Sequence, residues 1–191
     1  MVVNSETLTP NQAARRSRVI DAALALSAEG GYDAVQMRDV AARAQVALGT
    51  IYRYFSSKDH LLAACQVELW KAQAGRFAER PPDGATPSAR VQTVIGRAMR
   101  GALREPERTA AMITACASPD PAVRECQAEI MEIMDGVLVG AMADVDPDRR
   151  QRIAITLRQI WFSWLLNWVN GWNDAETVTE QINSSIGLLL D

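Results

Sequence analysis

Histidine is nearly missing from this 191-residue chain, which has only His60, and cysteine is scarce, with three residues. Cys65, Cys116 and Cys126 are odd in number and contain no C-x-x-C pair, which argues against a disulfide framework or a closed zinc site. A single histidine also removes most Ser/His and Cys/His catalytic arrangements. We therefore expect reduced thiols, no metal, no cofactor and no catalytic residues.

Long apolar runs are also missing. No stretch approaches the ~18 apolar residues that a membrane-spanning helix needs. The first residues, MVVNSETLTPNQAARRSR, lack the apolar core of a signal peptide. We expect a cytoplasmic protein with no membrane partner.

The chain has fewer positive than negative side chains, which gives a net charge of −3. This argues against attraction of the whole surface to nucleic acid. The charges are nevertheless uneven: residues 1–60 hold seven Lys and Arg against six Asp and Glu, whereas residues 61–191 hold thirteen against seventeen. A local basic patch near the N-terminus could therefore still bind phosphate.

Alternating strand patterns are absent, and apolar residues recur instead at helical spacing. Gly30 and Gly31 supply the left-handed stop that ends a first helix, and Ser56 or Ser57 can cap a long one. The fold class expected is all-α, with about nine helices. We expect them over residues 11–29, 37–44, 48–55, 57–79, 87–104, 107–117, 121–143, 147–171 and 174–190.

The stretch VALGTIYRYFSSKDHLL, residues 46–62, belongs to the second of two short helices that follow a longer one, and to the start of the next helix. This layout can present a helix end to the major groove of DNA. Gly49 leaves the backbone bare, and the hydroxyls of Thr50, Tyr52 and Tyr54 can donate to phosphate oxygens. Ile51, Phe55, Leu61 and Leu62 are expected to face inward. A single tyrosine beside a helix is more often core, but the ordered combination favours a helix-turn-helix.

The segment GGYDAVQMRDVAARAQVALGTIYRYFSSKDHLL resembles the helix-turn-helix of TetR-type transcriptional repressors, with a match over residues 15–62. Within that family it is similar to the KstR-like branch, the repressors of sterol catabolism. The resemblance implies a homodimer that binds a palindromic double-stranded DNA operator. It implies a three-helix DNA-binding domain over residues 1–57, and a helical body over residues 58–191 that binds a small molecule and dimerises through its last two helices.

Carried onto matching positions, the resemblance implies a set of DNA contacts. Leu48, Gly49 and Arg53 would lie nearest the bases, and Arg15, Arg16 and Arg18 could form a basic arm. Alternatively, Arg38 and Arg43 pair with Asp39 or Glu29 on a solvated face. The full set of expected contacts is Arg15, Arg16, Gln36, Arg38, Leu48, Gly49, Thr50, Tyr52, Arg53, Tyr54 and Lys58.

Three residues depart from the family pattern. Gln45 stands where glycine is usual in the turn, and costs roughly 1 kcal/mol more than glycine if φ must be positive. Ala47 replaces a serine that would cap the helix expected over residues 48–55, which we call the reading helix. Ser27 replaces a core aromatic, so Tyr32 or Met37 is expected to fill that space.

The body carries large soft side chains that could line an apolar cavity. Four tryptophans, at 161, 164, 168 and 172, have helical spacing and are expected to share one face of a helix. The default interpretation of such a face is core or dimer interface. A sterol-derived acid or its coenzyme A thioester, a fatty acyl group and a hydrophobic drug are all compatible effectors. The expected ligand contacts are Trp70, Met99, Met112, Met131, Met134, Trp161, Trp164 and Trp168.

Two other functions compete with a ligand-released repressor. A sensor or dimerisation module that does not bind DNA is favoured by the acidic total charge, by Gln45 and by Ala47. An enzyme would need a polar constellation that one histidine and scattered carboxylates do not provide.

Overall fold

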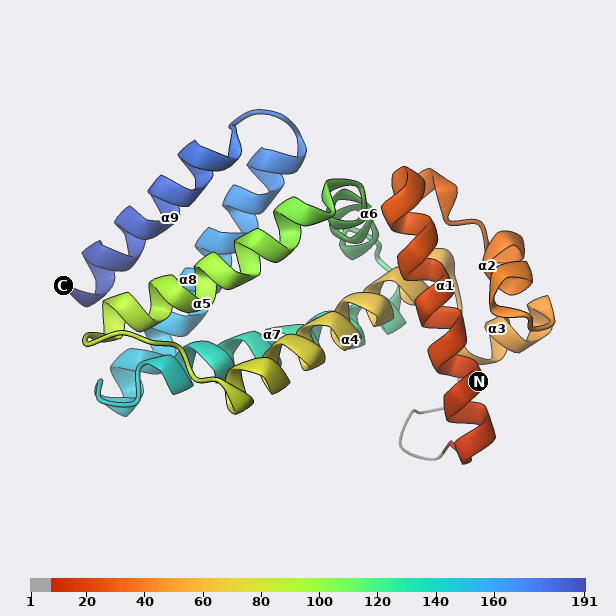
Figure 1. Ribbon diagram of the computed structural model, residues 1–191, viewed down its shortest axis with the longest axis horizontal. Helices are drawn as coiled ribbons and strands as arrows, with labels where there is room; N and C mark the ends of the chain where they lie inside the picture. Colours follow the sequence, from red (N-terminus) through yellow and green to blue (C-terminus); the bar gives the residue numbers. More distant parts are fainter. Residues whose placement is uncertain (1–7) are drawn as a thin grey trace. The chain divides into compact units, whose positions relative to one another are not determined.

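The computed structural model describes residues 8–191, and within them the chain forms nine α-helices and no strand (Figure 1). The all-α prediction is confirmed, and most helix ends lie within two residues of the expected positions. The helices are α1 Pro10–Ala34, α2 Met37–Ala44, α3 Leu48–Tyr54, α4 Lys58–Glu79, α5 Pro87–Arg104, α6 Pro106–Cys116, α7 Pro121–Ala141, α8 Pro147–Val169 and α9 Ala175–Leu190.

Proline marks where many of these helices begin. Five of the nine helices in the described range, α1, α5, α6, α7 and α8, start at a proline. Proline fits the first helical position because its fixed φ is already helical and its missing N–H would have no helical partner there. Side chains of the preceding residues add caps: Thr9 forms a capping box with Gln12, and Asp146 and Asp174 accept from the backbone N–H groups of Arg149 and Thr177.

The chain divides into two compact units. The first combines Met1–Glu68, of which residues 1–7 lie outside the described part, with Glu105–Ala128, and the second combines Leu69–Arg104 with Glu129–Asp191. Both α4 and α7 begin in the first unit and continue into the second. The functional division expected at residue 57 remains a prediction, and its first seven residues also lie outside the described range.

The first unit packs α2, α3 and α6 against α1. Its core holds fully buried apolar side chains from each of the first four helices, and the inward placement expected of Ile51, Phe55, Leu61 and Leu62 is confirmed. The first helix continues past its expected end, but its regular part does stop where the glycines predicted: Gly30 and Gly31 have non-helical dihedral angles, and Gly31 has φ +68°. One more helical turn follows and leads into α2.

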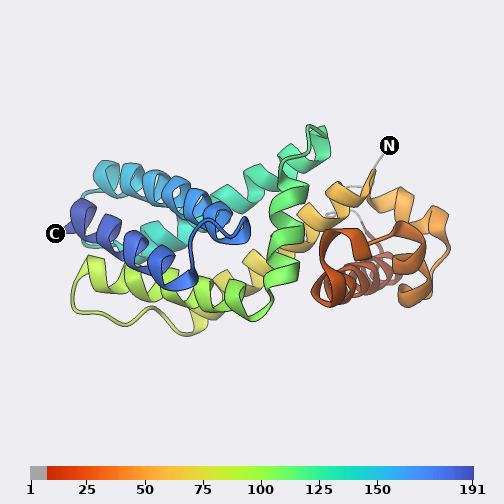
Figure 2. The same ribbon diagram turned by 90° about the horizontal axis from the view of Figure 1, so that it is seen from above.

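In the second unit, α9 packs against both α5 and α8, as the green and blue helices of Figure 2 show. The linker between α4 and α5 is held on α5 by donors about one turn apart. Arg97, Thr93 and Arg90 donate to the carbonyl oxygens of Arg80, Asp83 and Gly84, at 3.0, 3.0 and 3.2 Å.

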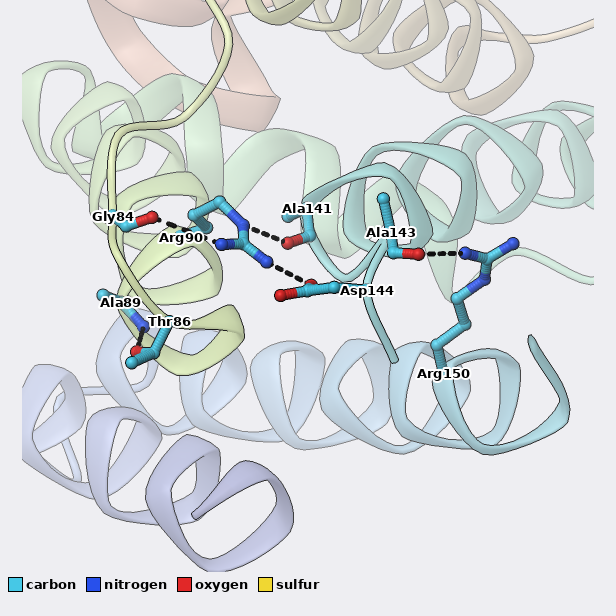
Figure 3. Close-up of polar contacts among 8 residues, drawn as sticks. All are labelled: Gly84, Thr86, Ala89, Arg90, Ala141, Ala143, Asp144 and Arg150. Atoms are coloured by element: carbon cyan, nitrogen blue, oxygen red, sulfur yellow. Dashed lines mark hydrogen bonds and ion pairs between the residues drawn. The ribbon is translucent and has the colours of Figure 1, made fainter. Parts of the chain in front are cut away.

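Arg90 also reaches the end of α7. Its Nε donates to the carbonyl oxygen of Ala141 at 2.7 Å, and another nitrogen pairs with Asp144 (Figure 3). One guanidinium thus joins the α4–α5 linker to the α7–α8 turn. A planar group with several donors in a fixed arrangement suits such a junction, which lysine could not reproduce.

Candidate DNA-binding surface

The turn between α2 and α3 depends on one residue in a left-handed conformation. Gln45 has φ 54° and ψ 49°, the only positive φ of a non-glycine residue within residues 8–191. Its N–H donates to the carbonyl oxygen of Ala42 at 3.2 Å, and the N–H of Val46 donates to that of Ala41 at 3.0 Å. A cost is expected at Gln45 if its φ is positive, and φ is positive here. Glutamine therefore occupies a conformation that glycine adopts more easily.

The short α3 begins without a side-chain cap, as expected from Ala47 at its N-cap position. Its attachment comes from apolar packing instead, because Ile51 is fully buried. Leu48 and Thr50 are half-buried, while Gly49, Tyr52 and Arg53 are exposed. No atom lies within 4 Å of the position that a Cβ would take at Gly49, so packing within the described chain does not require glycine there.

Tyr54 corrects the expected division of α3 into inner and outer faces. Its side chain is only 4% exposed, and its ring meets Phe55 edge-on with centroids 6.3 Å apart. Tyr54 is the third residue after the buried Ile51, and this spacing places both on the same side of a helix. The outward orientation expected of Tyr54 is wrong, whereas that of Tyr52, which is 51% exposed, is confirmed.

The arginines near the N-terminus lie within α1, as the helix expected over residues 11–29 requires, and their role as a basic arm on DNA stays a prediction. Arg16 pairs with Glu68 at 3.0 Å and lies 5.6 Å from the centre of the Phe55 ring. Arg18 donates to the carbonyl oxygen of Ala44 at 3.3 Å. Both side chains therefore join α1 to its neighbours, while Arg15 is exposed.

Of the two arginines of α2, Arg43 pairs with a carboxylate and Arg38 does not pair with any in the described part of the chain. Arg43 binds both carboxylate oxygens of Glu29, at 2.6 and 2.8 Å, which confirms one of the pairings considered from sequence. This hydrogen bonding lowers the pKa of Glu29 and raises that of Arg43. Arg38 is exposed and has no carboxylate partner within the described chain. Gln36 is also exposed, and its side-chain amide donates to the carbonyl oxygen of Asp33.

Lys58 and Asp59, at the start of α4, hold Tyr32 between them. Nζ of Lys58 lies 3.6 Å from the centre of the Tyr32 ring and donates to the Tyr32 carbonyl oxygen at 3.2 Å. The phenol of Tyr32 donates to Asp59 at 2.5 Å, and this hydrogen bond is the main cause that raises the pKa of Tyr32 to about 12. The ammonium group of Lys58, which was expected to contact DNA, thus already contacts Tyr32 within the protein.

Asp120, which directly precedes α7, contacts the residues just before α4 and was missed by sequence reasoning. Its Oδ2 accepts hydrogen bonds from the hydroxyls of Ser56 and Ser57, at 2.9 and 3.0 Å, and its Oδ1 accepts from the backbone N–H of Ala122. Ser57 also caps α4 by accepting from the N–H of His60, as expected. A signal was present, because an aspartate directly before a proline is typical of a helix start.

His60 is a buried acceptor. Its Nδ1 accepts from the backbone N–H of Ser56 at 3.0 Å, which requires that this nitrogen carry no proton. Burial is the main cause that lowers the pKa of His60. The contacts of His60 support the local fold, and no group of metal-binding residues gathers anywhere in residues 8–191.

The expected ligand contacts divide between the compact units. Met112 belongs to the first unit, and the other seven belong to the second. Met99, Met134 and Trp161 are buried, Trp70, Trp164 and Trp168 are half-buried, and Met131 is 39% exposed. Trp172 lies beyond the end of α8 and is 69% exposed, so the expectation that four tryptophans share one helix face is wrong for this residue.

A surface hollow in the second unit involves none of these residues. It is lined by Glu132, Asp135, Gly136, Val139 and Gln151. In addition, none of the helices in the described range is long and apolar enough to cross a membrane.

Two family profiles match most of the chain. Residues 19–65 match the bacterial regulatory proteins of the tetR family, and residues 84–189 match the tetracyclin repressor-like C-terminal domain. The HTH-type transcriptional repressor KstR of Rhodococcus jostii is 37% identical over 180 residues, which cover 94% of this chain and 84% of KstR.

Solved structures agree with the family profiles. A TetR transcriptional regulator from Rhodococcus sp. RHA1 has a TM-score of 0.85 and 30% identity, covering 94% of this chain and 97% of that one. Thermus thermophilus FadR, solved in complex with lauroyl-CoA, has a TM-score of 0.73 and 20% identity, covering 91% of this chain and 92% of that one. Together with the helix-turn-helix geometry, these matches show that the chain belongs to the TetR family, with relatives in its KstR-like branch.

Proposed function

We propose that the protein is a transcriptional repressor that binds a palindromic operator as a homodimer in the cytoplasm and leaves it when a hydrophobic small molecule binds. The observation that carries this proposal is that α3 has one buried side and one exposed side. Its inner side is anchored by Ile51 and Tyr54, while Gly49, Tyr52 and Arg53 are exposed. A rigid helix with a bare backbone and exposed donors can approach base edges and phosphates closely.

The proposed DNA contacts follow from this division. The residues proposed to face the bases are Leu48, Gly49 and Arg53, and those proposed to contact phosphates are Arg15, Gln36, Arg38, Thr50 and Tyr52. Arg16, Tyr54 and Lys58 already have contacts inside the protein. We therefore propose that they stabilise the helix-turn-helix and do not contact DNA.

Release would follow from dimer geometry. The two reading helices of a dimer must lie about 34 Å apart to enter successive major grooves. A ligand bound by the body, with Trp70, Met99, Met131, Met134, Trp161, Trp164 and Trp168 as proposed contacts, needs only a few kcal/mol of preference for one state. Because α4 is a continuous helix from Lys58 to Glu79, a displacement of its later turns would reach its start.

The relatives support a proposed class of effector. Thermus FadR was solved in complex with lauroyl-CoA, and the sequence alignment with the repressor KstR covers most of this chain. We infer an acyl compound, either a fatty acyl or a sterol-derived acyl group, as the acid or its coenzyme A thioester.

Binding to DNA from the region upstream of its own gene, measured over a salt series, tests the proposal. We expect Arg38→Ala to weaken binding to all sequences and to lower the salt slope by about one phosphate, and Arg53→Ala to weaken binding and to relax the preference for particular bases. Arg152→Ala removes an exposed charge of α8 and is the matched control. If the wild-type protein shows no salt-dependent binding to any selected DNA, a sensor that does not bind DNA replaces the repressor.

A further inference from the structure

The turn between α2 and α3 contains Gln45, whose backbone conformation disfavours any residue with a side chain. Its φ is 54° and its ψ is 49°, and no other non-glycine residue within residues 8–191 has a positive φ. Glycine adopts this conformation without the steric penalty that a Cβ brings. Strained residues of this kind persist mostly where their side chains have a function. Glutamine instead of glycine therefore points to a role of the side chain.

Within the part of the chain that the structure describes, the fold makes no use of the Gln45 side chain. Backbone groups donate both hydrogen bonds that close the turn, from the N–H of Gln45 to Ala42 and from the N–H of Val46 to Ala41. Glycine would form both of them. The side chain is exposed, and its amide forms no hydrogen bond with another residue of this range. Its donors are therefore available to a partner.

Gln45 lies next to the proposed DNA-binding surface. It is the only polar residue between Ala44, the last residue of α2, and Leu48, the first residue of α3. The N-cap residue of α3, Ala47, has no side-chain hydroxyl that could cap the helix or donate to a phosphate. Any side-chain hydrogen bond from this turn to DNA must therefore come from Gln45.

A guanidinium group lies beside the same turn. Nε of Arg18 donates to the carbonyl oxygen of Ala44, the residue before Gln45, at 3.3 Å. Arg18 is exposed, and none of the ion pairs formed within residues 8–191 includes it. Its charge is therefore not paired with a carboxylate there and attracts anions to the turn.

We propose that the side-chain amide of Gln45 donates to a phosphate oxygen of the operator, next to the charge of Arg18. This inference rests on the proposed DNA-binding function. It adds a contact that the family resemblance does not supply, because glycine is usual at this position. A glutamine amide has two N–H donors, and such side chains commonly contact DNA phosphates. A phosphate is favoured over a base because Gln45 precedes α3, whose exposed side is proposed to face the bases.

Operator affinity and stability, measured together on the full-length protein, test this contact. DNA fragments that the wild-type protein selects from a random pool serve as the probe, with fluorescence anisotropy as the measurement. Gln45→Gly and Gln45→Ala both remove the amide, so each should weaken binding by about fivefold or more, the usual effect of one hydrogen bond. Chemical denaturation should show that Gln45→Gly is nevertheless more stable than the wild type. If Gln45 acted only through the fold, the more stable variant would bind at least as tightly.

A change of charge and a matched control sharpen the test. Gln45→Glu keeps the Cβ and the length of the side chain but replaces the donor with a carboxylate. It should therefore weaken binding more than Gln45→Ala does, most strongly at low salt. Because the amide is uncharged, Gln45→Ala should leave the salt slope unchanged and weaken binding to all DNA sequences by the same factor. Gln92→Ala, which removes an exposed glutamine of α5, should bind like the wild type.

The contact is overturned if Gln45→Gly or Gln45→Ala binds the operator as tightly as the wild-type protein does. A loss of affinity confined to one base position also overturns it, because Gln45 would then contact a base. If the wild-type protein binds no DNA, both this contact and the repressor function are wrong. Tight binding by the wild-type protein and by the Gln45 variants alike removes this contact and leaves the repressor function intact.

Discussion

The hydroxyl of Ser57 donates to Oδ2 of Asp120 across 3.0 Å, although 63 positions separate the two residues in the sequence. Ser56 donates to the same oxygen, and the other carboxylate oxygen accepts from the N–H of Ala122 at the start of α7. One carboxylate therefore joins the beginning of α4, just after the reading helix, to the beginning of α7. This junction yields a prediction about stability.

Asp120→Ala should lower the free energy of unfolding by about 1 kcal/mol, the usual effect of removing a helix cap. Asp120→Asn is the matched variant, because it keeps an acceptor oxygen but no charge. The backbone hydrogen bond from Ala122 is the main cause that lowers the pKa of Asp120, and the serine hydroxyls add to it. The stability due to the charge is thus present at neutral pH and is lost as the pH falls through the lowered pKa. Urea unfolding of wild type and Asp120→Asn should differ at pH 7 and converge in acid; a difference independent of pH would contradict this account.

Tyr32→Phe should remove the hydrogen bond to Asp59 and keep the ring beneath Lys58. The exchange should lower the free energy of unfolding by about 1 kcal/mol at pH 8, since this hydrogen bond to a carboxylate is only partly shielded from water. Because the pKa of Tyr32 is raised to about 12, this contribution is complete below the ordinary tyrosine range and is lost as the pH rises through about 12. Denaturant unfolding of both proteins at pH 8 and at strongly alkaline pH checks this, and the phenolate absorbance that the wild-type protein gains near pH 12 should be missing from Tyr32→Phe.

Gln45→Gly should stabilise the protein by about 0.5–1 kcal/mol, because glycine adopts positive φ without the steric penalty that a Cβ brings. Gln45→Ala keeps the Cβ and therefore should bring no gain. Chemical denaturation of the three proteins provides the comparison. Equal stability of the glycine and alanine variants would show that the turn carries no strain.

The thiol of Cys65 should resist alkylation in the native protein. Cys65 is fully buried, and burial raises the pKa of its thiol far above the ordinary value, so the reactive thiolate is absent at neutral pH. Burial likewise raises the pKa of Cys116 to about 11. Iodoacetamide labelling at pH 8 followed by peptide mass spectrometry should find Cys65 unmodified before denaturation and modified after it. Rapid native labelling would show that the core around α4 opens readily.

Tyr52 and Tyr54 should respond differently to loss of the hydroxyl group. Tyr54→Phe keeps a buried ring, so operator affinity should stay the same at every salt concentration. Tyr52→Phe should weaken operator binding by about 1 kcal/mol if the exposed hydroxyl donates to a phosphate. Fluorescence anisotropy with one labelled operator measures both variants. A loss with Tyr54→Phe that equals that of Tyr52→Phe would return Tyr54 to the DNA-binding surface.

Local patterns were sufficient to predict the helices. The helical spacing of apolar residues predicted α2, over residues 37–44, with both ends correct, and Gly30 and Gly31 predicted where the regular part of α1 ends. These signals act within one or two turns of chain, which is the range over which helix starts and stops are decided. The helix-turn-helix and its family were accessible for the same reason.

The candidate site was predicted less completely, because the orientation of a side chain depends on what packs against it. Tyr54 has a hydroxyl suited to phosphate, but its position three residues after Ile51 turns its ring toward the core. Arg16 faces Glu68, and Ser57 faces Asp120, across distances in sequence that no local pattern covers. Such pairings appear only once the helices are assembled.

The first compact unit is built from two separate stretches of the chain, residues up to Glu68 and residues Glu105–Ala128. During synthesis from the N-terminus, α1, α2 and α3 emerge from the ribosome well before α6, which packs against α1. The unit can therefore be completed only after residue 128 has emerged, even though the reading helix was made long before. A nascent chain arrested before α6 would carry the whole helix-turn-helix and still lack one of the surfaces on which it rests.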